Sequence, residues 1–333
     1  IDFENKFVAI KIHFGELGNL SFLRPNYARA VADVVKELGG KPFLTDCNTL
    51  YVGSRKNALE HIETAYINGY TPYATGCQVI IADGVRGTDE AYIPIGCEEV
   101  KTAKIGRAIA DADIIISLNH FKGHEDAGFG GALKNLGMGS GSRAGKMEMH
   151  YDGKPVVDRD RCRGCRKCAT ICANDGIHYE SSKAVIDYDN CVGCGRCIAI
   201  CSFDAIKPHN SSSAASLNRR IAEYAYAVVK DKPNFHISIA ADISPNCDCH
   251  PENDAPIVPN IGMFASFDPV AIDLAAADAV NAMPANPRSA LSEAECRCHD
   301  HFINVHPNTN WRVQIEHGEE IGLGSSEYEL IRI

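Results

Sequence analysis

The sequence contains no long run of apolar residues, although apolar residues make up 45% of its 333 positions. A membrane-spanning helix needs about 18 or more consecutive apolar residues. The first residues also lack the basic stretch and apolar core of a secretory signal. We therefore expect a cytoplasmic protein without a membrane segment. A net charge of -10 argues against broad binding to nucleic acid or to anionic membranes.

Two nucleotide-binding motifs are also missing. No G-x-G-x-x-G sequence follows an expected strand, so nothing in the sequence indicates a dinucleotide, and the presence of a flavin stays open. A Walker P-loop is excluded because no glycine stands five positions before Gly145, and Lys146 is followed by Met147.

Cysteine, in contrast, is abundant. A chain of this length buries enough surface to fold without disulfides, so its 15 cysteines need another explanation. Eight of them form two runs with the spacing C-x2-C-x2-C-x3-C: Cys162, Cys165, Cys168, Cys172, and then Cys191, Cys194, Cys197, Cys201. The second run repeats the first after 29 residues, and Gly193 repeats Gly164, which indicates an internal duplication.

This spacing is typical of two [4Fe-4S] clusters. Three cysteines of one run hold three corners of a cube, and the fourth reaches the other cube, so the expected ligand sets are crossed. Residues 155–210 thus resemble a bacterial-type ferredoxin, although Ala173 and Ser202 replace the usual proline after the fourth cysteine. A pair of zinc sites is the alternative, but zinc sites usually show separated C-x2-C pairs.

The ferredoxin-like segment interrupts a larger pattern in which strands and helices alternate. Such alternation predicts an α/β fold, with a mostly parallel sheet and helices on both faces. The domains are then 1–154, the insertion 155–210, and 211–333 with a C-terminal tail. The expected strands are Phe7–Ile12, Lys41–Asp46, Gln78–Asp83, Asp113–Leu118 and Phe235–Asp242, and the expected helices are Asn26–Leu38, Lys56–Asn68, Glu98–Ala110, Ser216–Val229 and Pro269–Ala282.

Reactive residues follow the carboxyl ends of the expected strands. In parallel sheets, ligands bind at that edge. They include His13, Asp46, His120, Lys122, His124, Cys247, Asp248, Cys249 and His250. We expect Cys247, Cys249 and His250 to form a second metal site completed by His13, His124 or Cys47; alternatively, the two cysteines form a redox-active disulfide. Cys296, Cys298, His299, His301 and His306 are a weaker metal candidate in the tail.

Repeated glycines between Gly130 and Gly139 can bring backbone N–H groups close to an anion. Lys122, Lys134, Arg143 and Lys146 can neutralise that anion, and Lys122, His124 and Lys134 can bind it or donate protons. The pattern therefore predicts a carboxylate or phosphate pocket; a flexible, solvated loop is the alternative.

Three stretches resemble the family known as domain of unknown function 362. They are the Asn119–His124 segment with the glycine-rich stretch after it, the segment Ser266–Asp273, and a tail containing His306–Trp311. The resemblance extends over most of residues 6 to 285, and members often carry a ferredoxin insertion. It implies a fold but no reaction.

Together these patterns favour an iron–sulfur oxidoreductase. Two [4Fe-4S] clusters would pass low-potential electrons to a substrate or second cofactor, an additional metal or a flavin, at the carboxyl edge of the sheet. Lys122, His124, Lys134, Cys247 and Cys249 are the expected catalytic residues, and the expected partner is a redox protein or a small anionic substrate. The alternatives are a non-enzymatic electron carrier or accessory factor, and a metal-dependent enzyme with purely structural clusters.

The two cysteine runs generate the first prediction. Protein purified without oxygen will contain about eight irons and eight acid-labile sulfides per chain, because both quartets are complete. Metal analysis with a sulfide assay checks this. Four irons, or zinc in place of iron, would contradict it.

Overall fold

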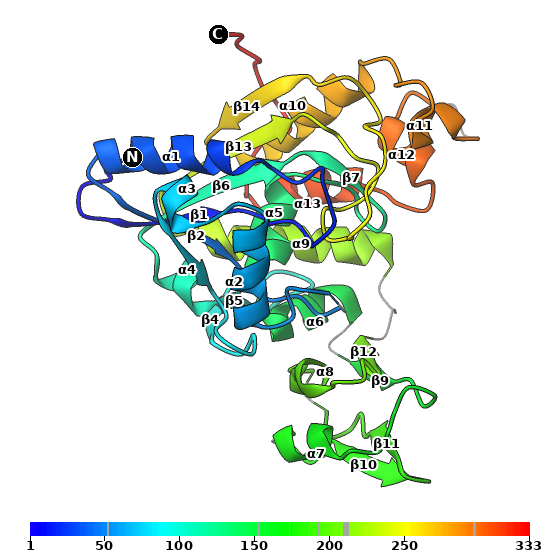
Figure 1. The fold of residues 1–333 in the computed structure, drawn as a ribbon. Helices are drawn as coiled ribbons and strands as arrows, with labels where there is room; N and C mark the ends of the chain where they lie inside the picture. Colours follow the sequence, from blue (N-terminus) through cyan, green and yellow to red (C-terminus); the bar gives the residue numbers. More distant parts are fainter. Residues whose placement is uncertain (52, 152–153, 173, 192, 209–212, 296–297) are drawn as a thin grey trace.

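The computed structural model describes the chain except at residues 52, 152–153, 173, 192, 209–212 and 296–297. A six-stranded sheet forms the centre of its larger part (Figure 1), in the order β14-β13-β6-β1-β2-β3. Neighbouring strands are parallel except β14, which pairs antiparallel with β13. The strands are β1 (Phe7–Lys11), β2 (Lys41–Asp46), β3 (Gln78–Ile81), β6 (Ile114–His120), β13 (Asn234–Ala240) and β14 (Gly262–Ser266).

Helices cover both faces of this sheet, as the α/β pattern predicts. Alternate residues of a strand point to opposite faces, so Val8 and Ile10 join one apolar core while Ala9 joins the other. The first core includes α1 and α2, and the second includes α5, α9 and α10. The helices of the larger part are α1 (Pro25–Glu37), α2 (Ala58–Ile67), α3 (Pro72–Thr75), α4 (Arg107–Asp111), α5 (Ala132–Ser140), α6 (Arg143–Tyr151), α9 (Ala214–Val229), α10 (Pro269–Asn281), α11 (Ala290–Glu293), α12 (His301–Val305) and α13 (Arg312–Glu320).

Two antiparallel hairpins lie outside the central sheet: β4 (Glu90–Pro94) with β5 (Thr102–Gly106), and β7 (Lys122–His124) with β8 (Gly128–Gly130). The helix expected over Glu98–Ala110 is therefore wrong. Ala103 and Ile105 are buried while Thr102 and Lys104 are partly exposed, and this two-residue alternation is that of a strand. A short helix, α4, begins only after Gly106.

The glycine-rich stretch is also different from the expected anion loop. It forms helix α5, and its first N–H groups, of Ala132 and Leu133, donate to the Asp273 carboxylate at 2.6 and 2.9 Å. A Cβ atom at Gly131 would lie 2.2 Å from Asp273 Oδ1, and one at Gly137 would lie 2.2 Å from the Ile221 carbonyl oxygen of α9. The glycines thus allow close packing, and the acidic group at this helix terminus is the protein's own Asp273, whose pKa burial raises to about 7.

The cysteine segment is a smaller body that follows α6 and precedes α9, seen below the sheet in Figure 1. It contains two antiparallel pairs, β9 (Pro155–Val157) with β12 (Ile206–Pro208) and β10 (Ile177–Glu180) with β11 (Lys183–Ile186). Helices α7 (Lys167–Ile171) and α8 (Arg196–Ile200) each follow a residue with φ of 66°, Arg166 and Gly195. These positions are 29 residues apart, so the backbone repeats with the sequence.

Contacts from the larger part hold the cysteine segment. The Lys56 ammonium lies 2.6 Å from an Asp204 carboxylate oxygen and 3.3 Å from the Cys201 carbonyl oxygen. Leu50 and Met147 pack into an apolar cluster with residues of the segment that include Ile206. The loops near Lys56 and helix α6 therefore seat the segment against one edge of the α/β part.

The described residues include no helix of the length and apolarity that crossing a lipid bilayer requires.

A close backbone approach sets the position of the loop after β13, residues 241–261. Gly123, in the middle of β7, donates its N–H to the Ser244 carbonyl at 2.9 Å, and a Cβ at Gly123 would lie 2.0 Å from the Pro245 carbonyl oxygen. Only glycine fits between these two backbone segments.

We predict that Gly123→Ala destabilises the protein by about 3 kcal/mol, because the backbone cannot move away as a flexible side chain would. The displaced loop should also expose the buried Cys247 to iodoacetamide. Thermal unfolding and peptide mass spectrometry measure both effects. Gly322→Ala is the control, since its positive φ costs about 1 kcal/mol but no atom lies within 4 Å. Equal stability and equal alkylation in the two variants would contradict the prediction.

Candidate functional site

The carboxyl ends of β1, β2, β6 and β13 meet at one edge of the sheet and surround a small hollow, the inner pocket, of about 70 Å³. A larger hollow of about 440 Å³, the outer cavity, lies between this edge and the cysteine segment. The two share Tyr51, Lys134, Met138 and Lys146 in their linings and are therefore continuous.

The inner pocket is rich in cations. Its lining includes Lys11, Arg55, Lys122, Lys134 and Lys146. Two of these have buried partners: Lys11 Nζ lies 3.0 Å from Asp46 Oδ1, and Arg55 Nε lies 3.1 Å from Glu16 Oε2. Burial opposes the charge on Asp46, yet Lys11 and neighbouring cations hold the pKa of this carboxyl below its usual range.

His13 enters the pocket directly after β1. Its Nδ1 accepts the Gly15 N–H at 3.1 Å, and its Nε2 lies 2.9 Å from Arg55 Nη1. Burial, followed by the charge of Arg55, lowers the pKa of His13 to about 3. The ring is therefore neutral at physiological pH.

His120, the last residue of β6, fixes the loop after β13. Its Nδ1 lies 2.9 Å from Asp248 Oδ2, and its Nε2 lies 2.9 Å from the Ala241 carbonyl oxygen. The Asp248 carbonyl also accepts the Glu16 N–H at 2.9 Å. These bonds set the positions of Cys247 and Cys249, on either side of Asp248.

The Cys247 sulfur is buried among cations. Lys134 Nζ lies 3.8 Å from Cys247 Sγ, and the Cys249 N–H donates to it at 3.4 Å. A hydrogen bond from the Cys249 thiol, reinforced by Lys122 and Lys134, lowers the pKa of Cys247 well below its ordinary value. Burial opposes the charge on Lys122, but Cys247 and Asp248 raise the pKa of Lys122. The pocket thus favours a sulfur anion beside ammonium groups.

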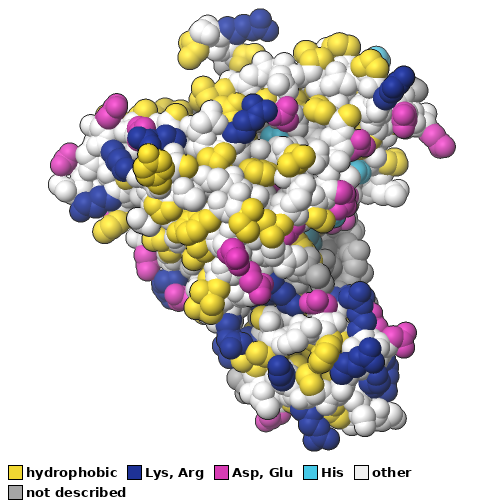
Figure 2. All heavy atoms as spheres, in the orientation of Figure 1, with side chains coloured by type: hydrophobic (Ala, Val, Ile, Leu, Met, Phe, Trp, Pro, Cys, Tyr) yellow, Lys and Arg dark blue, Asp and Glu magenta, His cyan; other side chains and the backbone are white. Residues whose placement is uncertain are grey.

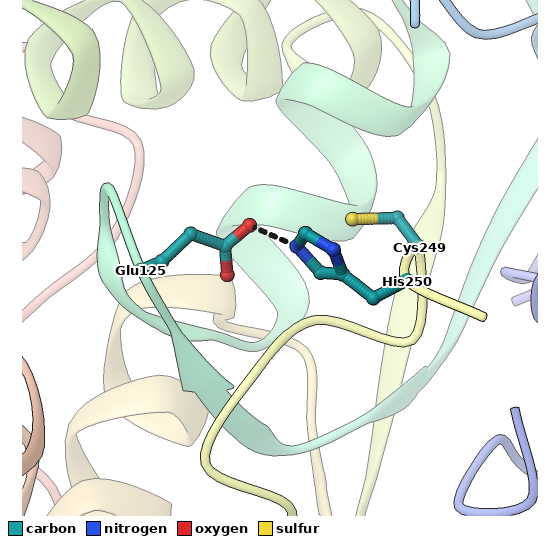
Figure 3. A group of neighbouring side chains, drawn as sticks. All are labelled: Glu125, Cys249 and His250. Carbon is teal, nitrogen blue, oxygen red and sulfur yellow. Dashed lines mark hydrogen bonds and ion pairs between the residues drawn. The ribbon is translucent and has the colours of Figure 1, made fainter. Parts of the chain in front are cut away.

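His124, at the end of β7, faces the outer cavity. Its Nδ1 accepts the N–H groups of Asp126 and Ala127, both at 3.1 Å, so the ring proton lies on Nε2. Next to it, Glu125 Oε1 lies 2.7 Å from His250 Nε2. Figure 3 shows the Glu125 carboxylate, the His250 ring and the Cys249 sulfur pointing toward one another from two loops.

The eight cysteines of the two runs divide into two sets. One hollow of the cysteine segment is lined by Cys162, Cys165, Cys168 and Cys201, and another by Cys172, Cys191, Cys194 and Cys197. Each hollow therefore combines three cysteines of one run with the fourth cysteine of the other run. Ile206 lines both the first of these hollows and the outer cavity, so the two hollows are neighbours.

The spacing of these sulfurs differs from that of a zinc site. Four thiolates around one zinc, each about 2.3 Å from the metal, lie about 3.8 Å apart. All eight cysteines belong to the described part of the chain, and no three of their sulfurs lie within 4.8 Å of one another. Among the described residues, no three of these sulfurs thus lie as close together as they would around one tetrahedral zinc ion.

Exposed basic side chains surround the first quartet, and three of them, Arg163, Arg166 and Lys167, also line its hollow. Lys and Arg gather on the surface of the cysteine segment in Figure 2, and those near the first quartet are exposed: Arg159, Arg161, Arg163, Arg166 and Lys167.

The structure brings most of the expected site residues to one edge, in two neighbouring places. His13, Lys122 and Cys247 line the inner pocket, whereas His124, Cys249 and His250 line the outer cavity, and Lys134 lines both. The predicted metal site is therefore different in composition. Cys249 and His250 form a group of close donor atoms with Glu125, and neither His13 nor Cys247 belongs to it.

The tail residues that the structure describes form no group of close donor atoms. Cys298 Sγ lies 2.9 Å from Asn304 Oδ1, His301 Nε2 lies 2.8 Å from the Met283 carbonyl oxygen, and His306 Nε2 lies 2.7 Å from the Pro245 carbonyl oxygen. His299 is exposed, and Cys296 lies outside the described residues.

Sequence reasoning missed Lys11, Arg55 and Glu125. Lys11 ends an otherwise apolar, buried strand, and a charge in that position is a usable signal of a site. Arg55 and Glu125 lie in loops, where charged residues are common, so the sequence carries no comparable signal for them.

Part of the chain is similar to a curated protein. A curated thylakoid-associated protein of Synechocystis sp. is 28% identical over 147 residues, which are 43% of this chain and 40% of that protein. The chain thus matches less than half the length of this relative.

Two solved structures are similar in part. A lactate racemase apoprotein from Thermoanaerobacterium thermosaccharolyticum has a TM-score of 0.37 at 11% identity, over 72% of this chain and 43% of that one. A protein from Thermotoga maritima has a TM-score of 0.33 at 11% identity, over 71% and 46%. Scores this low carry no argument about function.

The family model described as "Domain of unknown function (DUF362)" matches residues 8–278, which is most of the chain. This match confirms the resemblance predicted from the sequence motifs, and the chain belongs to the DUF362 family.

Proposed function

We propose that this chain is an iron–sulfur oxidoreductase, in which two [4Fe-4S] clusters pass electrons from a redox partner protein to a small anionic substrate at the sheet edge. One observation carries the proposal: the hollow of the first cysteine quartet and the outer cavity share the side chain of Ile206. A cluster in that quartet would stand at the wall of a cavity that leads to the cationic pocket.

The cysteines support cubic clusters rather than single metal ions. Each crossed set lines its own hollow, and its sulfurs are spaced too widely for one tetrahedral zinc. Cys162, Cys165, Cys168 and Cys201 would hold one cluster, and Cys172, Cys191, Cys194 and Cys197 the other. When bound, these clusters would supply one-electron redox chemistry.

The pocket residues support an anionic substrate. Lys122 and Lys134 have no carboxylate within ion-pair distance among the described residues, and both line the inner pocket. Their charges are met instead by the Cys247 sulfur and the more distant Asp248. An incoming carboxylate or oxyanion would complete their coordination beside the His124 ring, which hydrogen-bonds the Cys247 sulfur.

A second function, that of a non-enzymatic electron carrier, has an observation in its favour. The exposed basic residues around the first quartet suit an acidic partner protein. In the oxidoreductase proposal, the same surface would bind the redox partner protein that supplies electrons to the clusters. The carrier leaves the buried cations of the inner pocket without a role.

We predict that Lys122→Ala removes substrate-dependent oxidation of the clusters. Titanium(III)-reduced protein is mixed anaerobically with a panel of small carboxylates that carry a reducible C=C or keto group as the electron acceptor, and reoxidation is followed by the visible absorbance of the clusters. The rate with the best acceptor should fall by about 100-fold, the effect of removing one electrostatic donor from a buried site. Iron content should stay unchanged.

Lys6→Ala is the matched control, because Lys6 is exposed and lies away from both hollows. It should behave as the unaltered protein does. If Lys122→Ala retained full reactivity, or if only a protein acceptor reoxidised the clusters, the carrier function would be favoured.

A further inference from the structure

A group of three donor side chains opens onto the outer cavity: Glu125, Cys249 and His250 (Figure 3). One carboxylate oxygen, the cysteine sulfur and one ring nitrogen all lie within 4.8 Å of one another. We propose that this triad binds one divalent transition-metal ion of the zinc or iron(II) class. The site goes beyond the proposed function and does not depend on the iron–sulfur clusters.

The donor set selects the class of metal. A thiolate with an imidazole favours borderline-soft ions over magnesium and calcium, which prefer oxygen ligands. A carboxylate is a third ligand that both zinc and iron(II) accept. Three protein ligands leave at least one coordination position open, which is the arrangement of catalytic rather than structural metal sites.

The protein holds the donors in place from two directions. Glu125 lies in the turn between β7 and β8, where its Oε1 is 2.7 Å from His250 Nε2 and its Oε2 accepts the Cys247 N–H at 3.4 Å. Cys249 follows Asp248, which is fixed by His120. A metal ion would replace the proton between Glu125 and His250 and the proton of the Cys249 thiol, so binding would release protons.

A neighbouring group competes less well for the ion. His124 and Asp126 also lie within 4.8 Å of Glu125, counted between donor atoms. However, His124 Nδ1 already accepts two backbone N–H groups, and Asp126 is exposed. The triad with Cys249 offers the stronger ligand set because it includes a thiolate.

The open position indicates the class of ligand that the metal would take. It faces a cavity of about 440 Å³, a volume suited to a small molecule, and Lys134 lines the same cavity. An anionic group would bridge the metal ion and the Lys134 ammonium. We therefore assign the site to small carboxylates or oxyanions.

Zinc is the probe for the test. Full-length protein, purified anaerobically with its clusters, is dialysed against Zn²⁺ and analysed for both metals. We expect one zinc per chain in addition to the iron. X-ray absorption at the zinc edge should show one sulfur at about 2.3 Å and nitrogen or oxygen ligands at about 2.0–2.1 Å.

Variants locate the site. Cys249→Ser, Glu125→Gln and His250→Gln should each weaken zinc binding by at least about 10-fold, since even groups that only orient ligands have effects of that size. Cys298→Ser and Glu63→Gln are controls, because both residues are exposed and neither belongs to the donor groups. They should leave zinc affinity and iron content unchanged.

The outcomes separate this site from the clusters. No retained zinc beside eight irons would show that the triad is only an ion pair, and the oxidoreductase proposal would stand. A shell of four sulfurs would place the zinc in a cysteine quartet and overturn the assignment. Zinc bound by the triad in protein without iron would support the site and contradict the clusters.

Discussion

The contact between β7 and the loop after β13 determines the rest of the site. Gly123 lets two backbones meet where any side chain would collide, and the His120–Asp248 pair fixes the loop on its other side. This contact places Cys247 near Lys122 and brings Cys249 and His250 to Glu125. Residues more than a hundred positions apart thereby form both the inner pocket and the donor triad.

Electrostatics then determines what the site can hold. Burying several ammonium groups together is costly unless anions lie among them. Asp46 and Asp248 supply part of that charge, and the Cys247 sulfur supplies more. Two further cations, Lys134 and Lys146, line both hollows and therefore lie where the hollows meet. Residues of the cysteine segment line the far side of the outer cavity, so in the proposed function the electron source and the anion site would face each other.

The sequence predicts those parts of the molecule that local pattern controls. Strands such as β6 are recognisable because both faces are buried, and the cysteine spacing predicts the crossed sets seen in the hollows. Contacts between residues far apart in the sequence cannot be predicted from local pattern. Asp273 accepts the first N–H groups of α5 and so stabilises a helix in a glycine-rich stretch whose sequence predicts a loop. Likewise, Arg55 contacts Glu16 and Glu125 contacts His250 only because loops distant in the sequence meet in the fold.

The central claim is that a cluster stands at the wall of the outer cavity. Anomalous diffraction from anaerobic crystals, collected on both sides of the iron absorption edge, locates each iron directly. We predict two groups of four iron positions, one enclosed by Cys162, Cys165, Cys168 and Cys201 and separated from the cavity by Ile206. Single metal positions in the quartets, or iron positions remote from Ile206, would contradict this account.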